Sequence, residues 1–231
     1  MLLFEIKAKD KMQNHKFYKN VLFDLDGTLS DPKLGVVNAI IYACDKWGIT
    51  DYTRKEFLKF IGPPLHLSFK NRFNMSDDDA ASIVKDYRVY YEDKGKFENE
   101  LYPGIKELLD ILHTSGRKIA VATSKPTYFS EQIMEHFGIA SYLDCLVGSN
   151  LDNTMSEKED IIRVALQKLG VKNISDCVMV GDRMFDIDGA RANGIDSIGV
   201  LYGYGSEAEI DEHIAKYKVA TVRELAELLL Y

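Results

Sequence analysis

The apolar residues along the chain recur in two different patterns. Between residues 33 and 99 they are spaced three or four apart, as in Leu34, Val37 and Ile40, which is typical of amphipathic helices. From residue 100 onward, short apolar runs alternate with stretches of helical spacing. The first part therefore predicts helix after helix, and the second predicts strands that alternate with helices.

Buried strands that alternate with helices are typical of a parallel sheet covered on both faces. We therefore predict an α/β fold with a Rossmann-like parallel sheet core, formed by residues 20–32 and 100–231. We also predict that residues 33–99 form an inserted all-helical cap domain and that residues 1–19 are an N-terminal extension, either a flexible leader or a peripheral strand. The predicted strands cover residues 21–23, 118–124, 143–147, 177–182 and 197–201.

Hydroxyl residues mark several predicted helix starts. A Ser or Thr followed three residues later by an acidic residue can satisfy free N–H groups at a helix N-terminus. This pattern occurs at Thr53, Ser76, Ser156, Ser206 and Thr221. The segment Gly203-Tyr204-Gly205 lacks the spacing of a dinucleotide site, and we predict only that it leads into the helix after Ser206.

The composition narrows the classes of function. With 36 acidic and 29 basic residues the net charge is −7, which disfavours a nucleic acid polymer or an anionic membrane as partner. The apolar run at residues 1–4 is too short for a signal peptide, and no stretch approaches the ~18 apolar residues of a membrane span. The widely spaced Cys44, Cys145 and Cys177 predict free thiols in a reducing cytoplasm.

Two carboxylates follow the first predicted strand. The apolar residues 21–23 lead into Asp24 and Asp26, whose side chains would point the same way along an extended strand. Gly27 then allows a turn that can bend them around one point. Such close like charges repel, so that a shared proton, a basic side chain or a cation must compensate them. A hard divalent cation, which takes oxygen ligands, fits the pair best.

Polar residues also follow two other predicted strands. Thr123 and Ser124 end one strand, and Asp182 ends another, with Asp186 close behind. Ligands of open parallel sheets bind at the carboxyl ends of the strands. Each residue alone could be part of a turn or a helix cap, and Asp188 fits a helix start in the same way. Several acids at one sheet edge, however, indicate a cation there.

Lys158 stands at an unfavourable place for a cation. If Ser156 caps the following helix, Lys158 lies in its first turn, where the helix dipole disfavours positive charge by ~0.3–1 kcal/mol. It is either a solvated lysine or a side chain that faces the acidic residues or a phosphate group.

Together these residues predict a phosphoryl-transfer site. Asp24 could attack phosphorus and form an aspartyl-phosphate, while Asp26 could protonate the leaving oxygen and then activate water. Hydroxyls of Thr123 or Ser124 with Lys158 would stabilise the phosphoryl oxygens. A metal ion would neutralise charge and align the phosphate, and Mg²⁺ is the candidate.

The sequence resembles the haloacid dehalogenase superfamily, in particular its phosphoglycolate phosphatase and nucleotidase-like branch. The resemblance is carried, in family order, by four segments: Asp24-Leu25-Asp26-Gly27-Thr28-Leu29, Thr123-Ser124-Lys125, Lys158, and Gly181-Asp182-Arg183-Met184-Phe185-Asp186. It implies that Asp24 is the nucleophile and a Mg²⁺ ligand. It also implies that Asp26 is the acid/base and, through its main-chain carbonyl, a further ligand. Asp182 would be another ligand, with Asp186 a ligand or a supporting acid in the shell around the metal.

The resemblance also implies roles for the phosphate-binding residues and for the cap. Gly27, Thr123, Ser124, Lys125 and Lys158 would bind the phosphate group, with Thr123 and Lys158 taking part in catalysis. The segment 61–65 looks like the part of the cap that faces the active site, which makes Gly62 and Pro63 candidate substrate contacts; the alternative is a plain turn between helices.

These observations predict a Mg²⁺-dependent phosphatase, an enzyme that hydrolyses a small phosphomonoester such as phosphoglycolate or a nucleoside 5′-monophosphate. An acid at the position of Asp26 is similar to phosphatases and mutases and argues against cleavage of C–halogen or C–P bonds. A sugar phosphomutase is the alternative enzyme, and a non-catalytic regulatory binding protein the alternative of another class. Either a monomer or a dimer fits the sequence.

Overall fold

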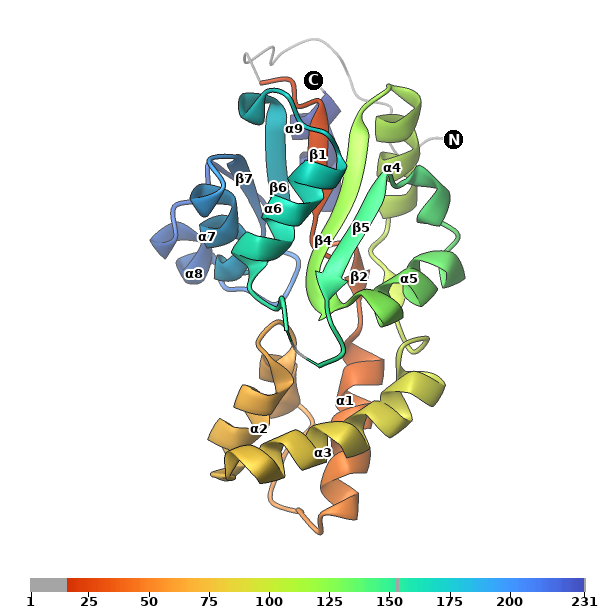
Figure 1. Ribbon diagram of the computed structural model, residues 1–231, viewed down its shortest axis with the longest axis vertical. Helices are drawn as coiled ribbons and strands as arrows, with labels where there is room; N and C mark the ends of the chain where they lie inside the picture. Colours follow the sequence, from red (N-terminus) through yellow and green to blue (C-terminus); the bar gives the residue numbers. More distant parts are fainter. Residues whose placement is uncertain (1–15, 153, 231) are drawn as a thin grey trace.

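The computed structural model describes residues 16–152 and 154–230 of the 231-residue chain. An α/β core forms one lobe, and the helices of residues 33–99, here called the helical insertion, form the other (Figure 1). Residues 1–15 of the predicted N-terminal extension lie outside the described part. Of the rest of that extension, Tyr18 is buried, and its hydroxyl donates to Asp196 Oδ2 at 2.7 Å.

Six parallel strands form the core sheet in the order β5-β4-β1-β6-β7-β8. The first strand lies in the middle of the sheet, where Val21 is in register with Ile119 of β4 and Val178 of β6. The strands are β1 Asn20–Phe23, β4 Lys118–Pro126, β5 Cys145–Ser149, β6 Cys177–Gly181, β7 Asp196–Val200 and β8 Tyr217–Val219. This sheet confirms the predicted α/β class.

Two strands differ from their predicted ranges by two residues, and a further strand was not predicted. β4 continues to Pro126, with an irregular register between Ala122 and Pro126, so that Thr123 and Ser124 lie within its irregular end. β5 begins and ends two residues later than the predicted 143–147. β8 was not predicted, because its three residues include the exposed Lys218 and form no apolar run.

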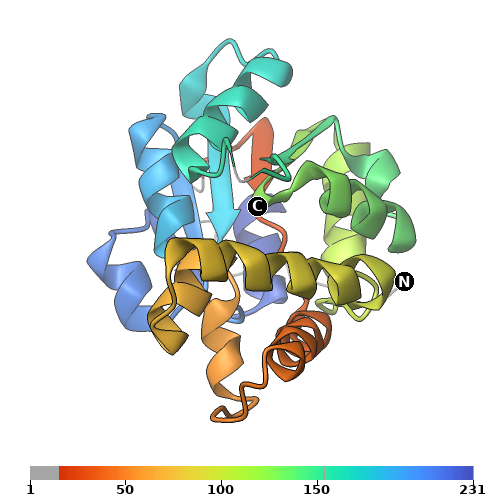
Figure 2. The ribbon, with the colours of Figure 1, turned by 60° about the horizontal axis from the view of Figure 1, so that its bottom comes forward.

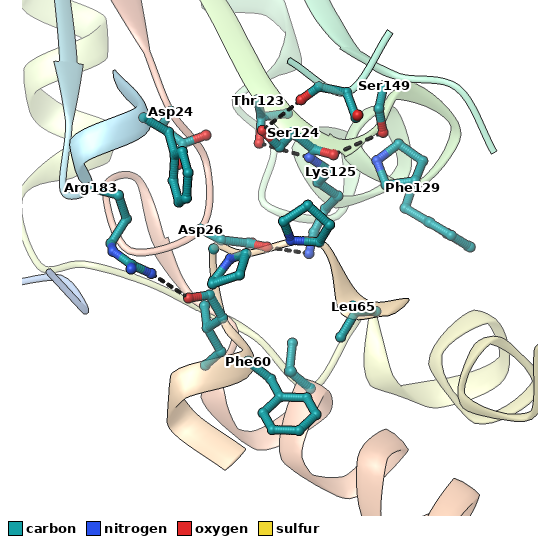
Figure 3. A pocket seen from close by; sticks show the side chains of 18 of the residues that line it. Asp24, Asp26, Phe60, Leu65, Thr123, Ser124, Lys125, Phe129, Ser149 and Arg183 are labelled. Atoms are coloured by element: carbon teal, nitrogen blue, oxygen red, sulfur yellow. Dashed lines mark hydrogen bonds and ion pairs between the residues drawn. The ribbon is translucent and has the colours of Figure 1, made fainter. Parts of the chain in front are cut away.

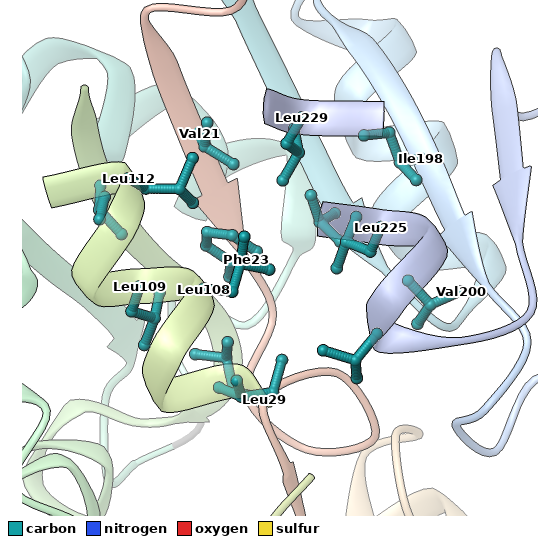
Figure 4. Close-up of a cluster of buried hydrophobic side chains, with 14 of the residues drawn as sticks. Val21, Phe23, Leu29, Leu108, Leu109, Leu112, Ile198, Val200, Leu225 and Leu229 are labelled. Atoms are coloured by element: carbon teal, nitrogen blue, oxygen red, sulfur yellow. The ribbon is translucent and has the colours of Figure 1, made fainter. Parts of the chain in front are cut away.

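Alternate residues of β1 pack under different helices. Val21 and Phe23 contact the apolar cluster beneath α4 Ile105–Thr114 and α9 Val222–Leu230, as Figure 4 shows. Leu22 points to the other face, beneath α6 Lys158–Lys168 and α7 Met184–Ala192. Each such fully buried side chain contributes about 1.5–3 kcal/mol. The remaining core helices are α5 Thr127–His136 and α8 Glu207–Glu212, with the 3-10 turns η3 Ala140–Tyr142 and η4 Ile174–Asp176.

The helical insertion has an apolar cluster of its own. It contains α1 Lys33–Lys46, the 3-10 helix η1 Glu56–Phe60, α2 Leu65–Phe73, α3 Asp77–Tyr90 and the π-helical turn η2 Tyr91–Gly95. Phe57, Phe69 and Ile83 are fully buried within it. Figure 2 shows these helices lying across one end of the α/β core. The prediction that helix follows helix here is confirmed.

Two short strands join the lobes. β2 Ser30–Asp31 leads into the helical insertion and β3 Glu100–Leu101 leads out of it, and the two pair antiparallel. The sequence did not predict this pair, since two residues are too short for a pattern. The pairing places the two chain crossings between the lobes next to each other.

The predicted helix starts have mixed outcomes. Ser76 and Ser206 are N-caps whose hydroxyls accept N–H groups, and Thr221 Oγ1 accepts the N–H of Glu224. At Thr53 only half of the capping box forms, and the helix begins later, at Glu56. The prediction for Ser156 is wrong: Glu157 is the N-cap residue of α6, with no side-chain cap bond.

Two predictions from composition concern the described residues directly. The three cysteines are free, with Cys44 and Cys177 buried and Cys145 half-buried. No described helix is long and apolar enough to cross a membrane.

Candidate active site

Three acids meet where β1 and β6 end side by side. Asp24 directly follows β1, and Asp182 directly follows β6. Asp186 joins them from the first turn of α7. One carboxylate oxygen of each lies within 4.8 Å of the others, and all three residues are buried. The sheet therefore brings together three of the four predicted metal ligands by their side chains.

Lys158 lies against these acids. It is 7% exposed, and its ammonium group contacts Asp24 Oδ1 at 2.8 Å and Asp186 Oδ1 at 2.8 Å. It also donates to the carbonyl of Ala122 at 3.0 Å. Burial alone would lower the pKa of Lys158, but the two carboxylates outweigh it and raise that pKa. The structure thus excludes a solvated lysine and places the cation among the acids.

Asp182 is the least compensated of the three acids. Its residue is fully buried, and its Oδ2 accepts the main-chain N–H of Tyr204 at 2.7 Å. Its Oδ1 has no hydrogen-bond partner among the described residues. Burial, together with the charges of Asp186 and Asp24, raises the pKa of Asp182 to about 8. A hard divalent cation with oxygen ligands fits this group of oxygens.

Glycines allow the main chain to enclose Asp182. A Cβ on Gly27, which has φ +87°, would lie 2.2 Å from the Asp182 carboxylate, and one on Gly203 would lie 2.4 Å from Asp182 Cβ. The Gly203 to Gly205 loop, predicted only to lead into a helix, is therefore part of the site. The sequence feature that could have indicated this role is the pair Gly203 and Gly205 on either side of Tyr204. The N–H of Gly27 donates to the carbonyl of Ser30, so a phosphate contact by Gly27 remains a prediction.

Asp26 is paired with a different lysine from the one that contacts Asp24. Its Oδ2 pairs with the ammonium group of Lys125, as Figure 3 shows, and its carboxylate is not part of the acidic cluster. The Lys125 nitrogen also lies 4.9 Å from the ring centre of Tyr91 in the helical insertion. Burial raises the pKa of Asp26, while Lys125 opposes this effect. Asp24 and Asp26 thus line the same cavity, but only the Asp24 carboxylate joins the acidic cluster.

Hydroxyl groups line the β4 side of the site. Thr123 is buried, and its Oγ1 accepts the N–H of Lys125 at 3.3 Å. The Ser124 hydroxyl donates to the carbonyl of Ser156 at 3.3 Å, and the Ser149 hydroxyl donates to the carbonyl of Ser124 at 2.8 Å (Figure 3). Thr123 and Ser124 both reach the cavity, and Lys125 does so while paired with Asp26.

A cavity of about 150 Å³ separates these residues from the helical insertion. Gly62 and Pro63 line it from the insertion side, so the segment predicted to face the site does so; their contact with a substrate remains a prediction. The insertion wall is largely apolar and aromatic, with Phe60, Tyr87 and Tyr91 among its residues. The sequence had not predicted the lining residues Phe129, Ser149, Arg183 and Phe185.

Comparison with known proteins agrees with this architecture. The sequence profile of the haloacid dehalogenase-like hydrolases matches residues 21–200. A 5′-nucleotidase of Pseudomonas aeruginosa is 39% identical over 212 residues, covering 92% of this chain and 96% of that protein. A tyrosine-protein kinase of Mycobacterium bovis is 36% identical over 90% of this chain and 72% of its own length. The crystal structure of a predicted phosphatase from Clostridium acetobutylicum has a TM-score of 0.88 and 45% identity, covering 93% of this chain and 99% of that one.

The fold, the buried acids and the likeness to the 5′-nucleotidase and the predicted phosphatase identify the protein as an enzyme, a phosphoric monoester hydrolase. The chain belongs to the haloacid dehalogenase-like hydrolase family, which confirms the resemblance inferred from its motifs.

Proposed function

We propose that this enzyme is a Mg²⁺-dependent phosphatase that works through a phosphoryl group carried on Asp24. The observation that supports this most directly is the position of Asp24, a buried carboxylate at the floor of a cavity, 2.8 Å from Lys158 and beside Asp182. A carboxylate in such a place can act as a nucleophile towards a bound phosphate ester.

In the first step, a carboxylate oxygen of Asp24 forms a bond to phosphorus while the ester P–O bond breaks. Asp26 donates a proton to the leaving oxygen. Its Oδ2 is held by Lys125, whereas its buried Oδ1 has no hydrogen-bond partner among the described residues and is free to exchange a proton. Thr123 or Ser124, with Lys158, hold the phosphoryl oxygens during the transfer.

In the second step, Asp26 takes a proton from water, and the water oxygen attacks phosphorus. The bond between phosphorus and Asp24 then breaks, which gives inorganic phosphate and restores the carboxylate. Lys158 compensates the negative charge of the Asp24 carboxylate and then that of the phosphoryl group bonded to it, and its contact with Asp186 fixes its position.

The metal would be held by the carboxylates of Asp24 and Asp182 and by the main-chain carbonyl of Asp26. Asp186 would support this site from behind, because its oxygens already contact Lys158 and the N–H of Arg183. When bound, Mg²⁺ would neutralise the charge of the phosphate group and orient it for attack.

The helical insertion would act as a cap domain, residues 33–99, that closes over the substrate and excludes bulk water. The small cavity favours a small phosphomonoester, and a nucleoside 5′-monophosphate or phosphoglycolate is the class we propose. The three free cysteines fit a reducing cytoplasm as the place of this activity.

A Mg²⁺-dependent phosphate-release assay over nucleoside monophosphates, phosphoglycolate, sugar phosphates and phosphotyrosine tests the proposal. We expect release from at least one ester, and its loss by a factor of at least about 10³ in Asp24→Asn, which keeps the shape but not the nucleophile. The matched control is Asp188→Asn, since Asp188 pairs with Arg191 and His213 on the surface and should matter little. Equal release by Asp24→Asn, or transfer of phosphate to a second substrate without release, would refute the proposal.

A further inference from the structure

Arg183 connects the two lobes across the cleft. Its Nη1 donates to the carbonyl of Ile61 in the helical insertion at 2.9 Å, a bond visible in Figure 3. Ile61 is buried in the apolar cluster of the insertion, so its carbonyl moves together with that lobe. Arg183 itself directly follows Asp182 and lines the cavity.

The guanidinium group is held from behind by the core. Its Nε donates to Glu209 Oε1 at 2.9 Å, and the same oxygen accepts the N–H of Met184 at 2.9 Å. Glu209 is in turn fixed in the first turn of α8, where its own N–H donates to the Ser206 hydroxyl. A planar guanidinium can make both bonds at once, which a lysine ammonium group on the same stem cannot reproduce.

Gly62 makes room for this contact. Its φ is +105°, and a Cβ at this position would lie 2.5 Å from Arg183 Nη1. Two prolines, Pro63 and Pro64, follow directly and restrict the main chain as it leaves the contact. The loop is therefore shaped to present one carbonyl to one arginine.

Two other hydrogen bonds between the lobes lie on the side of η2 and α5. Glu92 accepts from the Tyr128 hydroxyl at 2.9 Å, and Lys96 donates to Gln132 at 2.7 Å. Both belong to the stretch just before the linker strand β3. The contact of Arg183 instead involves the loop before α2, which Figure 1 shows on the side of α7 and α8.

We propose that Arg183 is a positioning residue: with Glu209 behind it and Gly62 opposite, it latches the helical insertion closed over the site. The latch increases the fraction of molecules whose lobes are closed. Because apparent affinity scales with the fraction in the competent state, losing the latch weakens substrate binding more than it slows the reaction. The kinetic part of this inference rests on the proposed phosphatase function, and the conformational part does not.

The conformational test measures a distance between spin labels at Leu67→Cys in α2 and Glu207→Cys in α8, both exposed, with Cys145 replaced by serine. We expect a short, narrow distance distribution for the parent and a shift to longer distances in Arg183→Met, with Arg183→Lys between them. Gly62→Ala should shift the distances as Arg183→Met does, and the double variant no further, because both remove one contact.

Gly48→Ala is the matched control, since Gly48 also has positive φ, +65°, but a Cβ there meets nothing within 4 Å. It should keep the parent's distances. Identical distances in the parent and in Arg183→Met would overturn the latch.

The kinetic test follows KM and kcat separately on whichever ester the parent hydrolyses. We expect Arg183→Met to raise KM about tenfold, which corresponds to the loss of one hydrogen bond to a charged group. The kcat of the variant should stay within about twofold of the parent's. A fall in kcat with unchanged KM would instead assign Arg183 to the reacting groups and overturn the proposal. If the parent hydrolyses no ester, the proposed function fails, while the distance measurement still decides the latch.

Discussion

Replacing Asp182 with asparagine should make the metal-free protein more stable. The residue is fully buried, one of its oxygens has no partner among the described residues, and Asp24 and Asp186 lie close by. Asparagine has the same shape, and its carbonyl oxygen can still accept the N–H of Tyr204. The substitution therefore removes an uncompensated charge and leaves the packing intact.

The size of the effect follows from the pKa of Asp182, which burial raises from its ordinary 3.8 to about 8. Between these values the folded protein binds a proton that the unfolded chain has released, so the free energy of unfolding falls as pH rises. At neutral pH the loss is on the order of 4 kcal/mol, at 1.36 kcal/mol per pH unit. The Asp182→Asn variant should recover roughly 2 kcal/mol of this lost free energy of unfolding. The recovery is incomplete because burying the polar amide group still costs free energy. A recovery of this size corresponds to a Tm about 4–8 °C higher.

Thermal unfolding followed by fluorescence, in chelator and in excess Mg²⁺, measures this effect from about pH 5 to pH 8. The metal-free parent should lose stability as pH rises, and Asp182→Asn should lose less. Mg²⁺ at a hundred times its dissociation constant should stabilise the parent by about 2.7 kcal/mol, and the variant by much less. Asp196→Asn is the contrasting control: Lys16, Lys216 and Tyr18 hydrogen-bond to Asp196 and lower its pKa, so this variant should be destabilised and keep its Mg²⁺ response.

The reasoning would be refuted if metal-free Asp182→Asn were no more stable than the parent near pH 7.5, or if Mg²⁺ stabilised the two proteins equally.

Two further predictions concern the neighbours of these acids. Lys158→Met leaves Asp24 and Asp186 without their buried cation and should lower the free energy of unfolding by about 3–5 kcal/mol, as well as reduce activity. Urea denaturation measures this loss, and an unchanged midpoint would contradict the contacts at 2.8 Å. Gly27→Ala places a Cβ 2.2 Å from the Asp182 carboxylate and should weaken Mg²⁺ binding at least about tenfold by calorimetry, whereas Gly116→Ala, at positive φ with nothing within 4 Å, should bind Mg²⁺ as the parent does.

Local patterns were enough to predict the sheet and the acids at its edge. The apolar residues 21–23 make a buried central strand whichever partners it has, and parallel strands must bring their carboxyl ends to one edge. Asp24 and Asp182 therefore met as expected. Lys158 was recognisable because a cation in the first turn of a helix needs a compensating partner.

Contacts that use the main chain could not be predicted in this way. Asp182 accepts the main-chain N–H of Tyr204, and Arg183 donates to the main-chain carbonyl of Ile61. Almost every residue carries these main-chain groups, so nothing in the sequence marks these two as the partners. The pairing of β2 with β3 is hidden for the same reason, since four residues carry no periodicity.

The separation of Asp24 from Asp26 changes what the opening motif can do. Had both carboxylates faced one cation, as an extended strand would place them, they would have been two similar ligands. Instead each has its own lysine: Lys158 lies against Asp24, and Lys125 against Asp26. The proposed mechanism makes Asp24 the nucleophile and Asp26 the proton donor, and different surroundings suit two carboxylates to two such roles. In the proposed mechanism the turn after Asp24 lets the two neighbouring aspartates take separate roles, and the lysine beside each one is the residue through which that division can be tested.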